Sequence, residues 1–172
     1  ELEGELHSSG RAFRRPPLGA MIEIPSAALV AGALGERFDY LCVGTNDLIQ
    51  YTLAVDRADP RVGHLYDPMH PGVVRLLSSI VEAAREARVP LSVCGEMAAS
   101  PEAALLLVAL GYRELSMTPS AIAHVRRTLS VRKAHELESA VAPLLKSREL
   151  HARALVEALA SAEARPHRPV AR

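Results

Sequence analysis

The sequence predicts an α/β protein built on a parallel sheet, and two features of the chain carry that prediction. Short apolar runs of strand length alternate with longer stretches in which apolar residues recur at helical spacing. Such alternation is typical of parallel strands joined by right-handed helical crossovers. Polar residues also follow three successive strands, at the C-terminal ends where parallel α/β proteins place ligands. Four strands are predicted, too few to close a barrel, which takes about eight.

Length and composition narrow the classes of protein that fit. The 172 residues suffice for one domain with a hydrophobic core, and 49% hydrophobic with 23% charged residues is ordinary for a soluble globular protein. A formal net charge of zero and 3% aromatic residues argue against nucleic acid as the main partner. No apolar run approaches the roughly 20 residues of a membrane-spanning helix, and two cysteines do not suggest a disulfide scaffold. We therefore expect a cytoplasmic protein without membrane contact.

The first half of the chain begins with Glu1 rather than Met, which is consistent with a piece of a longer protein. Residues 1–17 indicate the end of a helix and a linker, and residues 18–25 indicate a strand that ends on an acid. An alanine-rich helix follows from Pro25 to near Gly35.

The central strand and the long segment after it come next. The strand begins near Phe38 and is expected to end at Asp47. Residues 49–69 carry mixed signals, which favour an active-site loop with short helical pieces.

The second half of the chain continues the alternation. Pro71 fits the first position of a helix, which is expected to end by Pro90 because its apolar stripe stops there. Later elements are predicted as a strand over 91–94, a helix over 100–111, a strand over 114–117, a helix over 118–129, and a helix from Ser130 that breaks near Pro143. Residues 164–172, rich in Arg and Pro, are expected to be frayed.

The central strand gives way abruptly to Gly44, Thr45, Asn46 and Asp47. Gly44 allows a close approach of the backbone to a ligand, while Thr45 and Asn46 supply hydroxyl, amide and backbone donors. With the carboxylate of Asp47, the group suits an oxyanion and a divalent cation. The alternative is that Asn46 or Asp47 only caps the next helix.

Glu23 and Asp47 end neighbouring predicted strands and should lie at the same edge of the sheet. Mg²⁺ typically takes one or two carboxylates together with substrate oxygens, so the pair predicts a magnesium site. The alternative is a pair of solvated or helix-capping acids.

Two cysteines and an arginine complete the candidate residues. Cys42, inside its strand, is expected to be a small buried apolar side chain. Cys94 ends a strand at the presumed active edge, where a protonated thiol can act as a proton donor, although a buried structural role is the alternative. Arg57 fits a phosphate partner, and the alternative is an ion pair with Asp56 or Asp59. His64 and His70 are loop histidines, which are usually not ligands.

Five motifs then occur in an order that resembles a known family: MIEIP at 21–25, VGTNDL at 43–48, QYTLAVDR at 50–57, HLYDPMHP at 64–71 and CGE at 94–96. Together they resemble the C-terminal part of the phosphoenolpyruvate (PEP)-binding barrel of the PEP-utilising enzymes, most of all the Enzyme I branch of the bacterial sugar phosphotransferase system. The resemblance implies barrel strands of about five to eight in a (β/α)8 fold with extra C-terminal helices. It also implies a partial barrel domain over 1–146 and a helix and tail over 147–172.

The resemblance also implies a role for each candidate residue. Glu23 and Asp47 would be the Mg²⁺ ligands, and Cys94 would protonate the enolate as pyruvate forms. The substrate would be held by Gly44, Thr45, Asn46 and Arg57.

In the family the phosphoryl group passes to a histidine on an N-terminal domain and then to the carrier protein HPr, and Enzyme I relatives form homodimers. This sequence contains neither that domain nor the first barrel strands, so we expect the chain alone to be inactive. Four alternatives remain: a nitrogen-branch paralogue of Enzyme I, a fragment of pyruvate phosphate dikinase or PEP synthase, a non-catalytic remnant acting as a binding module, and another Mg²⁺-dependent enolate lyase barrel. The Cys94–Glu96 and Arg57 segments argue against the last.

Overall fold

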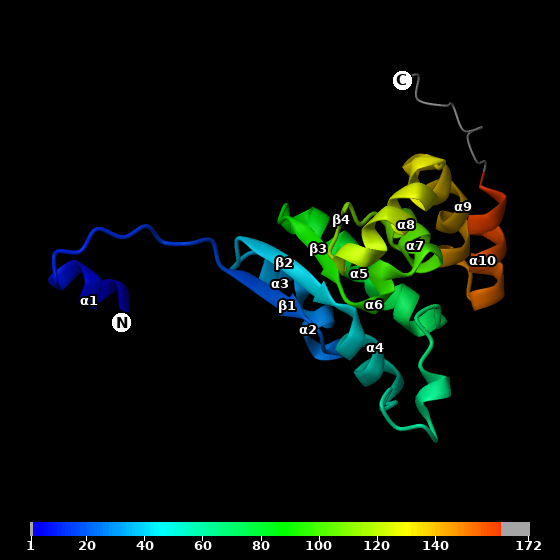
Figure 1. Ribbon diagram of the computed structural model, residues 1–172, viewed down its shortest axis with the longest axis horizontal. Helices are drawn as coiled ribbons and strands as arrows, with labels where there is room; N and C mark the ends of the chain where they lie inside the picture. The colour runs from blue at the N-terminus through cyan, green and yellow to red at the C-terminus, as the bar shows by residue number, and fades with distance from the viewer. Residues whose placement is uncertain (1, 163–172) are drawn as a thin grey trace.

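A four-stranded parallel sheet forms the centre of the protein in the computed structural model, which describes residues 2–162 (Figure 1). Its strands are β1 (Gly19–Ile22), β2 (Tyr40–Gly44), β3 (Leu91–Cys94) and β4 (Glu114–Leu115), and they lie side by side in chain order. Every neighbouring pair is parallel. The α/β class predicted from the alternating pattern is confirmed.

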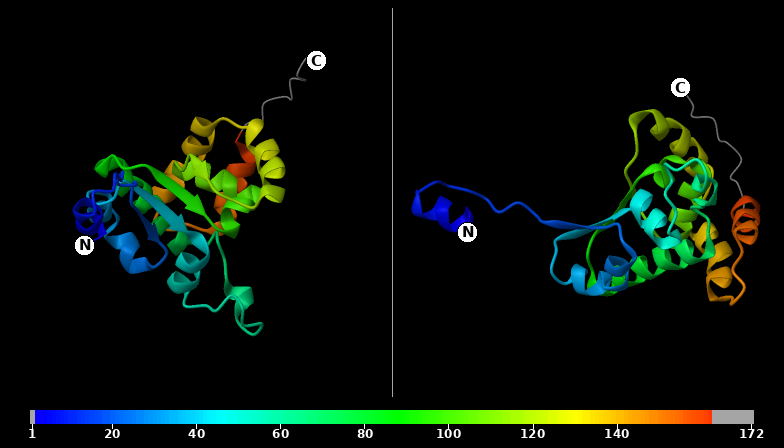
Figure 2. Two further views of the ribbon diagram at one scale, coloured as in Figure 1. Left: turned by 60° about the vertical axis from the view of Figure 1, so that its left-hand side comes forward. Right: turned by 90° about the horizontal axis from the view of Figure 1, so that it is seen from below.

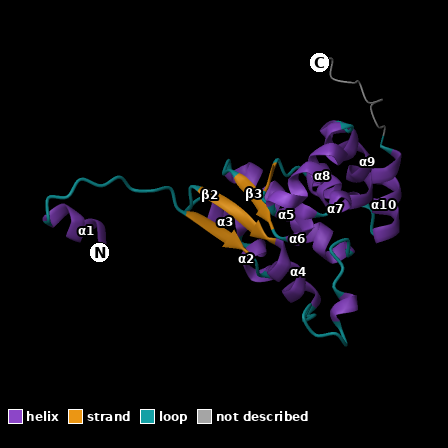
Figure 3. Cartoon of the chain, in the orientation of Figure 1, coloured by secondary structure: helices purple, strands orange, loops and turns teal. Residues whose placement is uncertain are grey.

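One face of the sheet is covered by helices and the other is open. Ile22, Leu41 and Val93 are fully buried on the covered face, where α2 (Pro25–Leu29), α3 (Ala31–Gly35) and α5 (Pro71–Ala87) pack against one another (Figure 3). Side chains alternate between faces along a strand. Accordingly Met21 is 51% and Tyr40 is 43% exposed on the opposite face. The open face matters below because the two cysteines lie on it.

Helix α5 has the ends that its sequence predicts. Pro71 is its first residue, and His70 precedes it with Nδ1 accepting a hydrogen bond from the Gly72 amide at 3.1 Å. The chain leaves the helix through Arg88, which has a left-handed backbone. The loop histidine His70 therefore has a structural role at the start of this helix.

Helix α7 (Pro101–Leu110) is buried on nearly every side, unlike a surface helix. Ser100 caps its N-terminus and Gly111, at φ +110°, ends it as predicted. Three further helices, α8 (Pro119–Ser130), α9 (Ala134–Lys146) and α10 (Ala152–Ser161), pack around α7 on the side away from β1, as Figure 1 shows.

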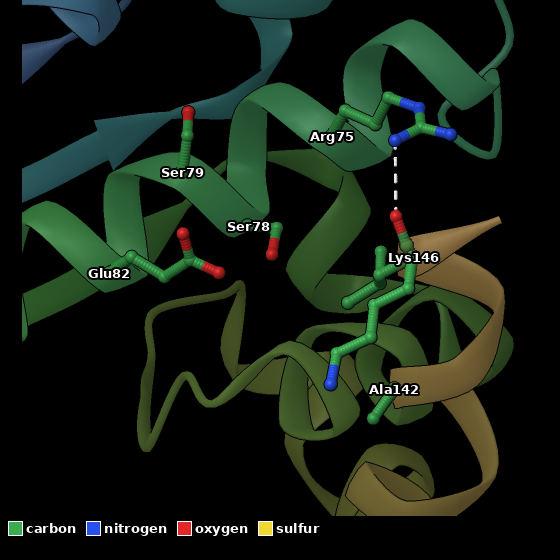
Figure 4. Close-up of a pocket in the computed structure, with 7 residues that line it drawn as sticks. Arg75, Ser78, Ser79, Glu82, Ala142 and Lys146 are labelled. Carbon is green, nitrogen blue, oxygen red and sulfur yellow. Dashed lines mark hydrogen bonds between the residues drawn. The ribbon is translucent and has the colours of Figure 1, made fainter. Parts of the chain in front are cut away.

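Helix α9 is tied to α5 by a single arginine. The guanidinium of Arg75 donates to the carbonyl of Leu145 at 3.1 Å, the bond drawn as a dashed line in Figure 4. It also donates to the carbonyl of Ser147, at the end of α9. Beside this contact lies a surface cavity of about 330 Å³ lined by residues that include Ser78, Glu82 and Lys146. Cations at a helix C-terminus are favourable because the last carbonyls have no partner in the helix.

Several boundaries differ from the sequence-based prediction. The expected helix over 25–35 is interrupted at Val30, whose φ of −111° and ψ of 20° are not helical, so α2 and α3 are separate. The central strand ends at Gly44 rather than Asp47, because the backbone turns directly into α4 (Thr45–Leu53). A short helix that sequence reasoning missed, α6 (Glu96–Ala99), follows β3.

The C-terminal helices also differ from the prediction. Ser130 ends α8 instead of capping the next helix, which begins after Lys133. Pro143 lies inside α9 and does not break it. Proline removes one helical hydrogen bond, but its fixed φ is compatible with a helix, and buried Leu137 and Val141 hold α9 against the core. The frayed tail expected over 164–172 lies outside the described residues.

The N-terminal helix α1 (Leu2–Ser8) stands apart from the rest of the protein in Figure 1 and in the right-hand view of Figure 2. It has no buried residue, and an extended segment joins it to β1. This agrees with the expected helix end and linker over 1–17. Within the described part of the chain, no helix is both long enough and apolar enough to cross a bilayer.

Candidate active site at the carboxyl edge of the sheet

The parallel register brings the predicted site residues to one edge. Ile22 pairs with Val43, and Gly44 pairs with Cys94, so the residues that follow these three strands emerge together. Glu23 lies against Gly44: a Cβ placed on that glycine would be 3.2 Å from the Glu23 Cβ and 3.4 Å from its Oε2. The absence of a side chain at Gly44 therefore leaves room for the Glu23 carboxylate.

Thr45 and Asn46 connect the start of α4 to the loop that follows β3. Thr45 is fully buried, and its hydroxyl donates to the Cys94 carbonyl at 2.8 Å. The Asn46 Oδ1 accepts a hydrogen bond from the Glu96 amide at 2.9 Å. The N-cap of α4 is Gly44 and has no side-chain hydrogen bond. The alternative that Asn46 merely caps the next helix is therefore wrong.

Gly95 allows these two segments to touch. Its φ is +109°, a region that side-chain-bearing residues rarely adopt. A Cβ there would lie 2.3 Å from the Thr45 Oγ1 and 2.9 Å from the Asn46 Oδ1. The contact between the β2 and β3 ends depends on a glycine at this position.

The Cys94 thiol is held in its neutral form. Burial, followed by the neighbouring Cys42 thiol and the negative charge of Glu23, raises the pKa of Cys94 to about 11. Its Sγ lies 3.7 Å from the Cys42 Sγ. Cys42 is only partly buried and faces Cys94, so the expectation of a buried core cysteine is wrong for that side chain.

Arg57 is engaged by a different acid from those expected. Its Nη1 lies 3.1 Å from the Glu96 Oε1, and its amide donates to the Gln50 Oε1 at 3.2 Å. Asp59 pairs with Arg61 at 2.7 Å, and Asp56 accepts from the Ala58 amide. Both partners of the Arg57–Glu96 pair are solvent-accessible, so the pair contributes little stability and is easily exchanged.

Tyr66 and Glu96 belong to the site although sequence reasoning gave them no role. The Tyr66 hydroxyl donates to the Asn46 carbonyl at 3.4 Å, and its pKa is raised, chiefly by burial. The charges of Arg57, Glu96 and Asp47 act on the same phenol. The only available signal was their position inside the HLYDPMHP and CGE motifs. His64, in the short 3-10 helix at Gly63–Leu65, makes no side-chain hydrogen bond or ion pair with the described residues.

A cavity of about 530 Å³ opens at this edge. It is lined by Asn46, Cys94, Gly95, Glu96, Ala99, Ser116, Met117 and Thr118. The structure therefore brings Asn46 and Cys94 to one hollow, while Glu23, Asp47 and Arg57 are not in its lining. The hollow contains hydrogen-bonding groups and a protonated thiol, which is a chemistry suited to a small polar molecule.

The two carboxylates expected to bind Mg²⁺ remain available for a ligand. Neither Glu23 nor Asp47 has a hydrogen bond or ion pair with the part of the chain that the structure describes, and both are partly buried. Among those residues no group of three or more His, Cys, Asp or Glu side chains gathers into a metal site. The oxygen donors fit Mg²⁺, which needs one or two carboxylates and takes its other ligands from water and substrate.

Comparison with known proteins identifies the family. The sequence model described as PEP-utilising enzyme, PEP-binding domain, matches residues 1–134. The chain belongs to the PEP-utilising enzymes. This membership confirms the resemblance inferred from the five motifs.

Among these PEP-utilising enzymes, several curated relatives are similar to the chain. A phosphoenolpyruvate-protein phosphotransferase of Cupriavidus necator is 45% identical over 130 residues, 76% of this chain and 22% of that protein. A phosphoenolpyruvate-protein phosphotransferase of Mycoplasma genitalium is 43% identical over 129 residues, 75% of this chain and 23% of that protein. A protein of Escherichia coli named phosphoenolpyruvate-dependent phosphotransferase system is 38% identical over 148 residues, 86% of this chain and 19% of that protein. The match thus spans only about a fifth of each of these relatives.

Proposed function

We propose that the chain is the PEP- and Mg²⁺-binding part of a phosphoenolpyruvate–protein phosphotransferase, the Enzyme I of a cytoplasmic bacterial phosphotransferase system. The observation that carries this proposal is the hydrogen-bonded unit of Thr45, Asn46 and the Cys94–Glu96 loop beside the cavity. The names of the relatives support it, because most of them are phosphoenolpyruvate-protein phosphotransferases.

The proposal includes an architecture. Four parallel strands with outer helices correspond to half of an eight-stranded barrel, and we assign them as about strands five to eight. Residues 1–146 would form the barrel part, and residues 147–172 a C-terminal helix and tail. In a complete enzyme the open face of the sheet would become the barrel interior, and the protein would form a homodimer.

Substrate binding in this proposal uses an exchange of partners. Arg57 would leave Glu96, at 3.1 Å in the free protein, and pair with the phosphate or carboxylate of PEP. Asn46, with the Gly44 and Thr45 backbone amides, would hold the remaining oxygens. The exchange costs little free energy because the Arg57–Glu96 pair is solvent-accessible.

Glu23 and Asp47 would hold Mg²⁺, whose charge would neutralise developing charge on the phosphate oxygens when it is bound. Cys94 would deliver a proton to the methylene carbon of the enolate, so that pyruvate forms, and its thiolate would then recover a proton from water. A raised pKa favours this role because the thiol enters each turnover protonated. The phosphoryl group would go to a histidine on an N-terminal domain and from there to HPr.

Calorimetry of PEP binding in the presence of Mg²⁺ tests this proposal. The wild-type chain should bind PEP only when Mg²⁺ is present, and Glu23→Gln should weaken that binding at least tenfold because one charged ligand is lost. Glu82→Gln is the matched control, since Glu82 is exposed on α5 away from the site. Equal binding by the Glu23 and Glu82 variants would exclude Glu23 as a ligand, and no Mg²⁺-dependent binding would favour a non-catalytic remnant.

The proton-donor role makes a separate prediction in the complete enzyme. Cys94→Ala should stop pyruvate release while leaving the affinity for PEP within about threefold, because the thiol acts on the enolate after phosphoryl transfer. Isotope-labelled PEP and a pyruvate assay would measure the two quantities. Unchanged turnover in this variant would remove Cys94 from the mechanism. The dikinase or synthase alternative would instead be recognised by an ATP requirement of the complete enzyme.

A further inference from the structure

Cys42 and Cys94 form a pair of thiols that the proposed reaction does not need as a pair. They lie on adjacent strands, β2 and β3, and face the open side of the sheet. Their sulfur atoms are 3.7 Å apart, and both side chains are only partly buried. Neither side chain is sealed in the hydrophobic core, and Cys94 also lines the cavity at the carboxyl edge of the sheet.

The strand register decides what kind of bond this pair can make. Gly44 pairs with Cys94, and Cys42 pairs with Ser92, so the two cysteines are diagonal neighbours. Parallel strands are about 4.8 Å apart and rise about 3.3 Å per residue, so diagonal neighbours have Cα atoms about 8 Å apart, whereas disulfides usually need about 4.4–6.8 Å. A direct sulfur–sulfur bond would thus require the strands to shift, while a bridging atom would not.

The separation of the two sulfur atoms matches a bridging metal ion. A tetrahedral ion with metal–sulfur bonds of about 2.3 Å holds two sulfur ligands about 3.8 Å apart. We propose that Cys42 and Cys94 chelate a soft d¹⁰ divalent cation of the Zn²⁺ and Cd²⁺ class.

The coordination would be completed from solution. No third His, Cys, Asp or Glu joins the pair in a metal-ligand cluster among the described residues, so water or a small anion would occupy the remaining positions. Binding replaces two S–H bonds by two metal–sulfur bonds and releases two protons, with no change in oxidation state. Apparent affinity therefore rises with pH. Mg²⁺ prefers oxygen ligands and does not compete for thiols.

One consequence rests on the proposed function. Occupation of the pair would convert the Cys94 proton donor into a metal-bound thiolate, so Zn²⁺ would inhibit the complete enzyme. Cys42→Ser should retain turnover and lose this inhibition, since Cys42 has no role in the proposed reaction.

A spectroscopic titration tests metal binding without reference to PEP. The full chain, reduced and freed of metal with a chelator, is titrated with Cd²⁺ while the sulfur-to-cadmium charge-transfer absorbance is followed. We expect one Cd²⁺ per chain, displaced by Zn²⁺, and a loss of affinity of at least tenfold in Cys42→Ser and in Cys94→Ser. Ser92→Ala is the matched control because Ser92 is the register partner of Cys42 and lies on β3, two residues before Cys94. It should bind Cd²⁺ like the wild type.

Three results would overturn the proposal: no charge-transfer band at submillimolar Cd²⁺, an unchanged band in Cys42→Ser, or a band that Zn²⁺ does not displace. Thermal unfolding followed by circular dichroism identifies any variant that fails to fold, and Cys42→Ala then serves as a second test of the same sulfur. A positive cadmium titration combined with no PEP binding would retain the metal site and reject the proposed function. PEP binding combined with no cadmium band would retain the proposed function and reject the metal site.

Discussion

Gly95 is the residue on which the shape of the site depends most directly. Its φ of +109° and its contact with Thr45 let the loop after β3 lie against the start of α4. That contact orients the Glu96 amide toward Asn46. A side chain at this position would separate two segments whose polar groups act together.

Gly95→Ala should therefore lower the free energy of unfolding by at least about 2 kcal/mol, from backbone strain and from a Cβ forced against the Thr45 hydroxyl. Chemical denaturation measures the change. Gly32→Ala is the matched control, because no atom lies within 4 Å of a Cβ placed there and the residue is helical. It should be neutral or stabilising by up to about 1 kcal/mol. Equal effects at the two glycines would contradict the assigned contact.

The ionisation of Cys94 gives a prediction with a definite direction. Only the thiolate is alkylated readily, and the pKa of about 11 means that the thiolate fraction rises about tenfold per pH unit through pH 8–10. The alkylation rate by iodoacetamide in Cys42→Ser, measured by mass spectrometry, should rise accordingly with no plateau below pH 10. Removal of Cys42 takes away one contribution to the shift, but burial, the largest cause, remains. A plateau near pH 8.5 would indicate an ordinary, exposed thiol.

The same pKa shift affects stability in one direction. Because the folded-state pKa of Cys94 lies above its ordinary value of 9.0, the unfolded chain loses this proton first as pH rises. The contribution to stability is complete below pH 9 and is lost between pH 9 and about pH 11.

The position of a single residue was predictable from the sequence where that residue lies at the C-terminal end of a parallel strand. Glu23, Asn46 and Cys94 each follow an apolar run, and parallel strands bring such positions to one edge. The partner of Arg57 was not predictable, because Glu96 is 39 residues away and only the tertiary structure brings them together. The contact between Cys42 and Cys94, across 52 residues, was missed for the same reason.

At the scale of elements, helix ends with a proline or glycine signal were predicted and others were not. Pro71 and Pro101 are the first residues of α5 and α7, and Gly111 ends α7, as the backbone preferences of proline and glycine predict. The break at Val30 has no such signal, and the proline at position 143 indicated a helix end that does not occur, because α9 continues through it while packed against α7. Helix α6 was missed because four residues carry too little periodicity to recognise.

The attachment of α9 to α5 gives a prediction at this scale. Arg75→Met should lower the free energy of unfolding by about 1 kcal/mol, because two carbonyls at the end of α9 lose a charged donor. PEP affinity should not change, since Arg75 lies in a different cavity from Asn46 and Cys94. Glu82→Gln, on the same helix, is the control and should leave stability unchanged. A large loss of PEP binding in Arg75→Met would contradict this separation.

For the whole molecule, the alternating pattern predicted the parallel sheet but could not determine how the open face is completed. In the proposed half-barrel, closure would depend on further strands, which would pack near the exposed Met21 and Tyr40. The covered face was predictable because its strands alternate with apolar helices.

The open face leads to a prediction for the isolated chain. It should show no phosphotransferase turnover in a steady-state assay with PEP and HPr, because the proposed reaction would need further barrel strands and a phosphorylated histidine domain besides these residues. A complete enzyme carrying the same 172 residues serves as the positive control. Normal rates from the isolated chain would refute the half-barrel assignment.

The order of the strands in the sheet has a consequence for synthesis. Because β1, β2, β3 and β4 neighbour one another in the same order as along the chain, each strand leaving the ribosome finds its hydrogen-bonding edge already exposed by the strand translated just before it. No described strand has to wait for a distant segment before it can pair. The sheet can thus be laid down progressively from its N-terminal side, as translation proceeds.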